Sequence, residues 1–355
     1  MSSLAESARI LELSLPEGVT LRRTSGSPYR AAAIAPRRRR LDLLGVGPGL
    51  FQTRGTEKGR SQVPNRKIPE ADPYDRRRAK VLDSEISYID AGSGDAIVFL
   101  HGNGTYSYVW RNIIPFAEPF GRCLAPDLMG CGDSGKLPGS MYRIADQTRY
   151  LDAWFEALDL GDRITLVLHD WGGPIGFDWA HRNRDRIKGI AYMETLVQPL
   201  EWDDWPEIRR DLFKQFRSPM GEDLVLKDNF FIETIGTRMI GQLPEAVMDA
   251  YRRPYLEPGV SRLPTLTFTR ECPIGGEPAD VIEMIDRVGR WLSASELPKL
   301  FINAYPGSIL TGRQRNFCRS WPNQKEKTVL GIHYIQEDSP FQIGEAIADF
   351  LKSMR

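Results

Sequence analysis

The sequence predicts an α/β fold in which a mostly parallel central sheet carries helices on both faces and is interrupted by an inserted helical segment. Three observations predict it. From residue 80 onward, short apolar runs alternate with stretches of helical periodicity. The apolar runs are continuous, as in strands that are buried on both faces of a parallel sheet. The alternation stops near Pro199 and resumes at Pro298, so the residues between them form an insertion.

The predicted core contains both kinds of element. Each predicted strand is a short run rich in apolar or β-branched residues, and each predicted helix has apolar residues three and four positions apart. The predicted strands are residues 86–89, 96–100, 122–125, 164–168, 189–193, 298–303 and 328–331, and the predicted helices are residues 110–117, 144–158, 172–181 and 342–354.

These patterns divide the chain into four parts. Residues 78–198 and 297–355 form the two parts of the core, and residues 199–296 form a helical cap between them. Residues 1–77 hold fifteen Lys/Arg and eight Asp/Glu, a balance of +7, and show no sustained period. This composition is typical of a disordered basic leader, with a targeting or polyanion-binding segment as the alternative.

Composition argues against several classes of protein. The chain has 47 basic and 47 acidic residues, so it lacks the basic footprint of a nucleic-acid-binding protein. No apolar run approaches the roughly 20 residues that span a bilayer, and no apolar stretch near the N-terminus resembles a secretory signal. The four cysteines match no metal-binding spacing. We therefore expect no metal, no nucleic-acid partner, no membrane association and a cytoplasmic location, with the periplasm as the alternative.

The first chemical signal is the stretch LHDWGG at residues 168–173, where a buried strand passes into a helix. This is the nucleophile-elbow position, with Asp170 in place of the commoner serine. The glycines let the helix pack closely on the strand, and the helix N-terminus favours a carboxylate. Taken alone, the motif also fits an aspartate that caps a helix.

Three further signals lie at the ends of predicted strands. The loop HGN at residues 101–103 occupies the position that supplies an oxyanion-hole N–H. His333 follows the last strand, and Glu194 ends the strand at residues 189–193. Because ligands bind at the carboxyl ends of parallel strands, we expect these side chains to meet. Taken singly, they also fit an ordinary turn, a loop histidine and a structural carboxylate.

The order of these residues along the chain predicts their roles. Asp170, Glu194 and His333 follow the order nucleophile, acid, base. Glu194 would then act from an earlier strand than is usual. Asp338 is the nearest rival acid but follows His333, and Asp286 is a rival within the cap. We predict Asp170, Glu194 and His333 as the catalytic residues.

An aspartate nucleophile suits displacement at saturated carbon. Its carboxylate is ionised at neutral pH and can form an ester intermediate without losing a proton. His333 would activate water to hydrolyse this ester, and Glu194 would hold the imidazole. A leaving halide needs N–H donors in a dry pocket, and Trp171 and Asn103 offer an indole and a carboxamide donor.

These residues resemble those of the haloalkane dehalogenases among the α/β hydrolases. The match is to members with an Asp–His–Glu triad and an Asn–Trp halide clamp, such as those that degrade hexachlorocyclohexane. The resemblance implies an α/β-hydrolase fold with a helical cap. It also implies cofactor-free hydrolysis of haloalkanes to a primary or secondary alcohol, halide and a proton. The matching stretches are HGN at 101–103, DLMGCGDS at 127–134, HDWG at 169–172, YME at 192–194, LKDNFF at 226–231 and HYIQEDSP at 333–340.

The resemblance also implies a monomer whose partners are a small halogenated hydrocarbon and water. The sequence departs from the family at two places. Gly104 stands where proline is usual, and Phe268-Thr269 stands where a Trp-Pro pair is usual at the pocket wall. These departures bear on substrate range and on the rate of halide release. The residues implied to line the pocket are Trp205, Phe213, Phe231, Ile235, Phe268 and Ile309.

Three other functions fit the same fold. Epoxide hydrolases share the aspartate nucleophile and use paired cap tyrosines, and Tyr251 and Tyr255 have i,i+4 spacing. Coelenterazine-type luciferases, which are cofactor-free oxygenases, resemble the same dehalogenases and share the five site residues. A small-molecule receptor is the third alternative, which the complete set of catalytic residues disfavours. Asn103 beside Trp171 fits a halide better than an epoxide oxygen.

Overall fold

The structure of the protein is a computed structural model that describes residues 67–137, 139 and 141–355. Contacts divide the chain into two units, Met1–Ile68 and Pro69–Arg355, and the described helices and strands lie in the second. Most of the predicted leader, residues 1–66, lies outside the described residues. The second unit confirms the predicted fold class, with a mostly parallel sheet, helices on both faces and an inserted helical cap.

Within the described residues, one eight-stranded sheet has the order β1-β2-β4-β3-β5-β6-β7-β8. β1 with β2 and β2 with β4 pair antiparallel, and the pairs from β4 to β8 are parallel. The predicted strands correspond to β2 through β8. The strands are β1 (Arg77–Val81), β2 (Ser84–Gly92), β3 (Ala96–Leu100), β4 (Arg122–Pro126), β5 (Ile164–Asp170), β6 (Ile187–Thr195), β7 (Lys299–Pro306) and β8 (Gln324–Gly331).

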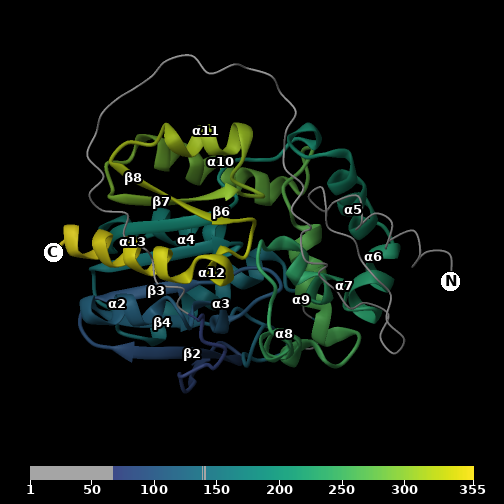
Figure 1. Cartoon of the computed structure of the whole chain (residues 1–355), viewed down its shortest axis with the longest axis horizontal. Coiled ribbons are helices and arrows are strands. Elements are labelled where there is room, and N and C mark those ends of the chain that lie inside the picture. Colours follow the sequence, from purple (N-terminus) through teal and green to yellow (C-terminus); the bar gives the residue numbers. More distant parts are fainter. Residues whose placement is uncertain (1–66, 138, 140) are drawn as a thin grey trace, which may run out of the picture. The chain divides into compact units, whose positions relative to one another are not determined.

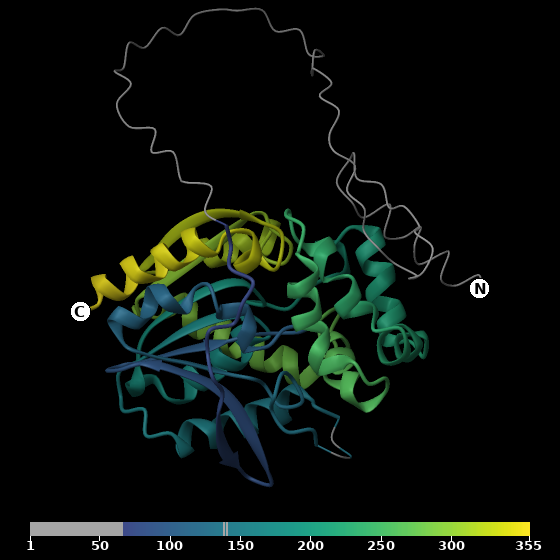
Figure 2. The same cartoon turned by 60° about the horizontal axis from the view of Figure 1, so that its bottom comes forward.

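Helices cover both faces of this sheet (Figures 1 and 2). On one face pack α3 (Ile144–Ala157), α4 (Gly172–Arg182) and α10 (Ala279–Ala294), and on the other pack α2 (Ile114–Ala117) and α13 (Pro340–Ser353). Among the described helices, none combines the length and the apolar character needed to cross a bilayer.

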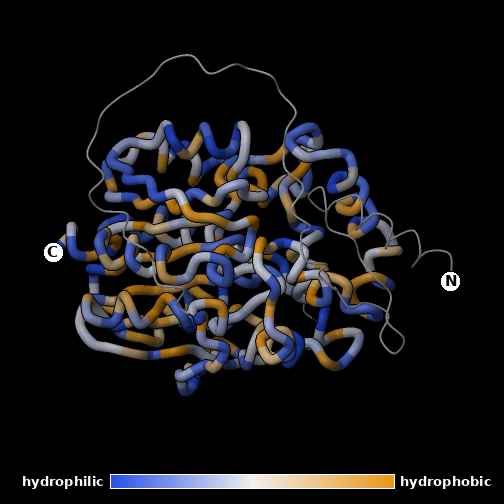
Figure 3. Tube along the Cα trace, viewed as in Figure 1, coloured by the Kyte–Doolittle hydropathy of each residue, from blue (hydrophilic) through white to orange (hydrophobic). Residues whose placement is uncertain are grey.

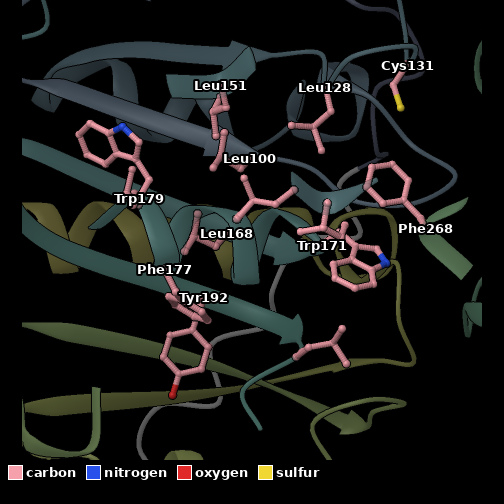
Figure 4. Close-up of a cluster of buried hydrophobic side chains, with 14 of the residues drawn as sticks. Leu100, Leu128, Cys131, Leu151, Leu168, Trp171, Phe177, Trp179, Tyr192 and Phe268 are labelled. Carbon is pink, nitrogen blue, oxygen red and sulfur yellow. The ribbon is translucent and has the colours of Figure 1, made fainter. Parts of the chain in front are cut away.

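Strand β5 shows why the central strands have continuous apolar sequences. Leu168 faces the side covered by α3 and α4, and Val167 faces the side covered by α2 and α13. Figure 4 shows Leu168 near Leu100 of β3 and Leu151 of α3, and Figure 3 shows hydrophobic residues along the central strands. Full burial of one such leucine stabilises the fold by about 1.5–3 kcal/mol.

The inserted segment forms short helices that gather at one end of the sheet (Figure 1). Helix α10, which the sequence analysis places at the end of the cap, packs against α4 of the core. The cap boundaries at residues 199 and 296 stay a prediction, and the contacts of α10 favour an earlier end. The helices before α10 are α5 (Glu207–Arg217), α6 (Met220–Glu222), α7 (Phe230–Glu233), α8 (Glu245–Arg252) and α9 (Leu263–Arg270).

The predicted helix at residues 110–117 is too long. The chain instead forms a 3-10 turn at Ser107–Trp110 and a single helical turn, α2. Pro115 lies in the first turn of α2. Proline has no N–H and its ring clashes with the carbonyl four residues earlier, so a regular helix cannot continue through this position from Trp110.

Residues 69–77, which the sequence analysis assigns to the leader, bond to the core. The Tyr108 hydroxyl donates to the carbonyl of Glu70 at 2.6 Å, and Asn112 Nδ2 donates to the carbonyl of Pro69 at 3.0 Å. The Tyr74 hydroxyl donates to Glu118 at 2.9 Å. These bonds make residues 69–77 part of the second unit.

Candidate active site

The candidate nucleophile lies at the turn between β5 and α4. Asp170 ends the strand with φ +49°, in the left-handed region that is costly for a residue with a side chain. Gly172 begins α4, and a Cβ there would lie 2.2 Å from the carbonyl oxygen of Leu100. The glycine therefore lets the helix start directly on the neighbouring strand, which presents Asp170 at the sharp turn.

Hydrogen bonds fix Asp170 in place. The backbone N–H of Asn103 donates to Asp170 Oδ1 at 2.6 Å, and the Thr195 hydroxyl donates to the Asp170 carbonyl at 2.6 Å. The side chain is buried, so the N–H replaces part of the water that a carboxylate would otherwise bind. The loop at residues 101–103 thus has the predicted place beside the carboxylate.

His333 lies between the two candidate carboxylates. Its Nε2 is 3.4 Å from Asp170 Oδ2, and its Nδ1 is 3.6 Å from Glu194 Oε2. Both distances suit an ion pair and are longer than a good hydrogen bond. The His333 N–H donates to the carbonyl of Arg238 at 3.0 Å, and its carbonyl accepts from His169 Nε2 at 2.9 Å.

Glu194 is held by a row of backbone donors. It is the residue before the last of β6, has φ +39° and is fully buried. The N–H groups of Ser308 and Ile309 donate to its Oε2 at 2.9 and 2.8 Å, and that of Leu310 donates to Oε1 at 3.4 Å. Three backbone N–H groups therefore fix the position of this carboxylate.

The two rival acids lie elsewhere. Asp338 accepts from the N–H groups of Ile240 and Gly241. Asp286 belongs to α10, which packs against α4. Within the described residues, neither comes within ion-pair distance of His333, whereas Glu194 does.

The opposite charges of His333 and the two carboxylates stabilise one another. Burial lowers the pKa of His333, but Asp170 and Glu194 outweigh burial and leave that pKa above its usual value. Burial raises the pKa of Asp170, but His333 and the Asn103 N–H leave it below its usual value. His169 has no such pair of carboxylates, and burial lowers its pKa to about 3. The site therefore holds an ionised Asp170 beside a basic His333.

The predicted halide donors differ in their surroundings. Trp171 directly follows Asp170, and its ring stacks on Phe268 with centroids 6.0 Å apart (Figure 4). Within the described part of the chain, its indole N–H makes no hydrogen bond. Asn103 Nδ2 instead donates to the Thr265 carbonyl and to Thr269 Oγ1, both at 3.1 Å.

Residues predicted to line the pocket come from the cap and from the loop after β7. Trp205 contacts Phe213 of α5 with ring centroids 4.5 Å apart, and Phe231 of α7 lies 6.3 Å from Phe216. Ile235 and Phe268 are fully buried, whereas Ile309 is partly buried in the loop that holds Glu194. The cap thus brings together an aromatic group near the site, and the lining role of each residue stays a prediction.

The structure gives a physical reason for the departure at Gly104. This residue has φ +72°, which proline cannot adopt because its ring fixes φ near −65°. A Cβ at this position would lie 3.0 Å from the Phe231 ring and from the Tyr334 hydroxyl. The loop therefore follows a backbone course that a proline would not allow.

Sequence reasoning missed a link between the cap and the candidate acid. Arg209 of α5 donates to the Ser308 carbonyl at 2.8 Å and to the Ser308 hydroxyl at 3.0 Å. Ser308 in turn gives its N–H to Glu194. No motif marks these residues, because the contact depends on how the cap folds over the loop after β7.

Comparisons with known proteins identify relatives of this chain. A family model described as the alpha/beta hydrolase fold matches residues 95–234. A haloalkane dehalogenase from Sphingobium indicum strain UT26 is 53% identical over 290 residues, which are 80% of this chain and 98% of that protein. Coelenterazine h 2-monooxygenase from Renilla reniformis is 39% identical over 287 residues, which are 78% of this chain and 90% of that protein.

Solved structures give the same result. Haloalkane dehalogenase DbeA from Bradyrhizobium elkani matches with a TM-score of 0.75 and 38% identity, over 79% of this chain and 98% of that chain. Haloalkane dehalogenase DatA from Agrobacterium tumefaciens C58 matches with a TM-score of 0.76 and 33% identity, over 81% of this chain and 99% of that chain.

The mostly parallel eight-stranded sheet, the sharp turn after β5 and the match to the family model define an α/β hydrolase. Within this class, the sequence identity to haloalkane dehalogenases over most of the chain determines the family. The chain belongs to the haloalkane dehalogenase family.

Proposed function

We propose that this protein hydrolyses small haloalkanes to an alcohol, a halide ion and a proton, with Asp170, Glu194 and His333 as the catalytic residues. One observation carries the proposal: an ionised, buried carboxylate lies between an N–H donor and a basic histidine at the elbow. Membership of the haloalkane dehalogenase family supports the same substrate class.

In the first step, a carboxylate oxygen of Asp170 attacks the carbon that bears the halogen. A carbon–oxygen bond forms as the carbon–halogen bond breaks, and both bonding electrons leave with the halide. The departing charge needs a donor that is already in place, because the site is buried. Trp171 follows Asp170 in the sequence, and its indole N–H, which has no hydrogen-bond partner in the described residues, fits this need.

In the second step, His333 takes a proton from water, and the hydroxide adds to the ester carbonyl of Asp170. The Asn103 N–H, already bound to Asp170 Oδ1, stabilises the charge that develops on that oxygen. The ester bond then breaks, the alcohol takes a proton and Asp170 is restored. One proton remains for each halide released.

The change of charge at Asp170 helps the second step. In the free enzyme, Asp170 and Glu194 together raise the pKa of His333. Esterification removes the negative charge of Asp170, so one of the two groups that raise this pKa is lost. His333 then becomes neutral, and able to act as a base, at a lower pH than in the free enzyme.

The epoxide hydrolase alternative lacks its proton donors. The Tyr251 hydroxyl donates to Glu337 at 2.5 Å, within a buried ion pair of the core. Tyr255 is fully buried and lies beside Cys131 of the core. Within the described residues, neither tyrosine contacts Asp170, so neither is placed to protonate an opening epoxide.

A halide-release assay tests the proposal. Short and long chlorinated and brominated alkanes are incubated with the wild-type enzyme and with Asp170→Ala as the matched control, and coelenterazine is tested for light emission. We expect wild type to release halide and Asp170→Ala to be inactive while keeping its circular dichroism spectrum. Light emission without halide release would favour the oxygenase function of the 39% identical relative.

A further inference from the structure

The Asn103 side chain is turned toward the cap. Its Nδ2 lies 3.1 Å from the Thr265 carbonyl and 3.1 Å from Thr269 Oγ1. A carboxamide nitrogen carries two hydrogens, so both are engaged. The Thr265 carbonyl can only accept, which fixes the nitrogen on this side and leaves Asn103 Oδ1 buried without a partner in the described residues.

Thr269 closes a ring of three bonds. Its hydroxyl donates to the Thr265 carbonyl at 2.8 Å, one turn earlier in α9. The hydroxyl hydrogen is therefore used, and a lone pair of Oγ1 is available to Asn103. All three residues are buried, so water does not compete for these bonds.

The two donors predicted for the halide are thus in different states. The Trp171 N–H is free, and a halide that binds it displaces no protein group. The two N–H groups of the Asn103 carboxamide already have acceptors. A halide that binds Asn103 must therefore replace one of these acceptors. The Thr265 carbonyl is a backbone group and remains whatever side chain is present. The Thr269 hydroxyl is a side-chain group, so the residue type at position 269 decides whether Asn103 has this second acceptor.

We propose that Thr269 is a positioning residue that weakens halide binding by holding Asn103 against α9. This inference rests on the proposed function. In the halide-free enzyme, the Thr269 hydroxyl satisfies an Asn103 N–H; when halide forms, that bond is exchanged for one to the halide. Trp171 provides most of the halide affinity, and release of halide is aided because Asn103 regains its partner.

Direct halide binding, measured without substrate, tests this inference. Bromide and chloride titrations of tryptophan fluorescence give Kd for wild type, Thr269→Val and Thr269→Ser, with Trp171→Phe as the control for the origin of the signal. Valine has nearly the shape of threonine but no hydroxyl, so it leaves an Asn103 N–H unsatisfied until halide enters. We expect Thr269→Val to bind halide about fivefold more tightly, the worth of one net hydrogen bond.

Thr269→Ser keeps the hydroxyl and should retain the Kd of wild type, which a merely structural role for the methyl group would not predict. The inhibition constant for bromide as a product should fall in Thr269→Val by the same factor as the bromide Kd. If Thr269→Val folds poorly, Thr269→Ala removes the same hydroxyl and is expected to act in the same direction.

Equal or weaker halide binding in the folded variants that lack the hydroxyl would overturn the inference. The proposed function fails separately: a wild-type enzyme that releases no halide from any haloalkane would contradict it whatever the halide Kd values are.

Discussion

The indole N–H of Trp171, the residue that follows Asp170, has no protein acceptor in the described residues, and we propose it as the main donor to a leaving halide. Trp171→Phe keeps an aromatic ring and removes only the donor. We expect the rate of halide release in a single turnover to fall by about 10²–10³-fold, as for other preorganised donors. Trp179→Phe, which alters a tryptophan stacked on Phe155 in the core, is the matched control. A wild-type rate in Trp171→Phe would place the halide donor elsewhere.

His169 makes stability depend on pH. Burial lowers its pKa to about 3, whereas an unfolded histidine titrates near 6.5. Between these values the unfolded chain binds a proton that the folded chain does not, so stability falls as the pH is lowered through this window. His169→Gln keeps a donor for the His333 carbonyl and does not titrate.

Urea unfolding at several pH values measures this effect. From pH 6.5 to pH 4, the free energy of unfolding of wild type should fall more steeply than that of His169→Gln, by up to about 1.4 kcal/mol per pH unit. Equal slopes would show that His169 is not kept neutral in the folded protein.

Residue type and position at strand ends were enough to predict that Asp170, Glu194 and His333 would come together. The orientation of the Asn103 carboxamide was not predictable in this way. It depends on the Thr269 hydroxyl, which is 166 positions away in the sequence. The three N–H groups that hold Glu194 could not be predicted from sequence patterns either, because every residue except proline has one.

At the scale of elements, the central strands were predictable because they are buried on both faces and have continuous apolar sequences. β1 was missed because its sequence RRAKV is charged and only Ala79 and Val81 are buried at the sheet edge. Helix α10 has an amphipathic pattern like those of the cap helices, so its packing on α4 could not be read from periodicity.

A buried ion pair joins two elements behind the site. Arg111 follows the 3-10 turn Ser107–Trp110, and its Nη1 and Nη2 donate to Glu337 at 2.5 and 2.8 Å. Glu337 lies in α12 (Ile335–Asp338), which comes directly after the loop of His333. The pair therefore anchors the segment that carries the candidate base.

Glu337→Gln leaves the Arg111 charge without a counter-ion in a buried place. We expect a loss of about 3–5 kcal/mol in the free energy of unfolding, measured in urea. Replacing both residues with methionine removes both charges and should cost clearly less than the single change. A single variant as stable as wild type would mean that water reaches this pair.

At the scale of the whole molecule, the fold class followed from the alternation of strands and helices, whereas the boundary of the core did not. Residues 69–77 are polar and aperiodic, yet they contribute bonds to Tyr108, Asn112 and Glu118. Whether residues 69–77 attach to the core depends on their hydrogen-bond partners in the core, and not on a hydrophobic pattern in their own sequence.

Two truncations test this boundary. A chain without residues 1–66 is expected to fold and to keep its kcat/KM. A chain without residues 1–76 loses three hydrogen bonds and should be less stable by about 3 kcal/mol, at about 1 kcal/mol for each bond. Scanning calorimetry and halide release measure both. Insolubility or low activity of the shorter deletion would show that residues 1–66 support the core.

The central claim is a two-step reaction in which Asp170 is alkylated and His333 is needed only to hydrolyse the ester. Intact-mass spectrometry of His333→Phe after exposure to a bromoalkane tests it most directly. The account predicts about one alkyl group per chain, located on Asp170 by peptide mapping, with one equivalent of bromide released and no further turnover. Continued turnover without an adduct, or an alkyl group on another residue, would contradict it.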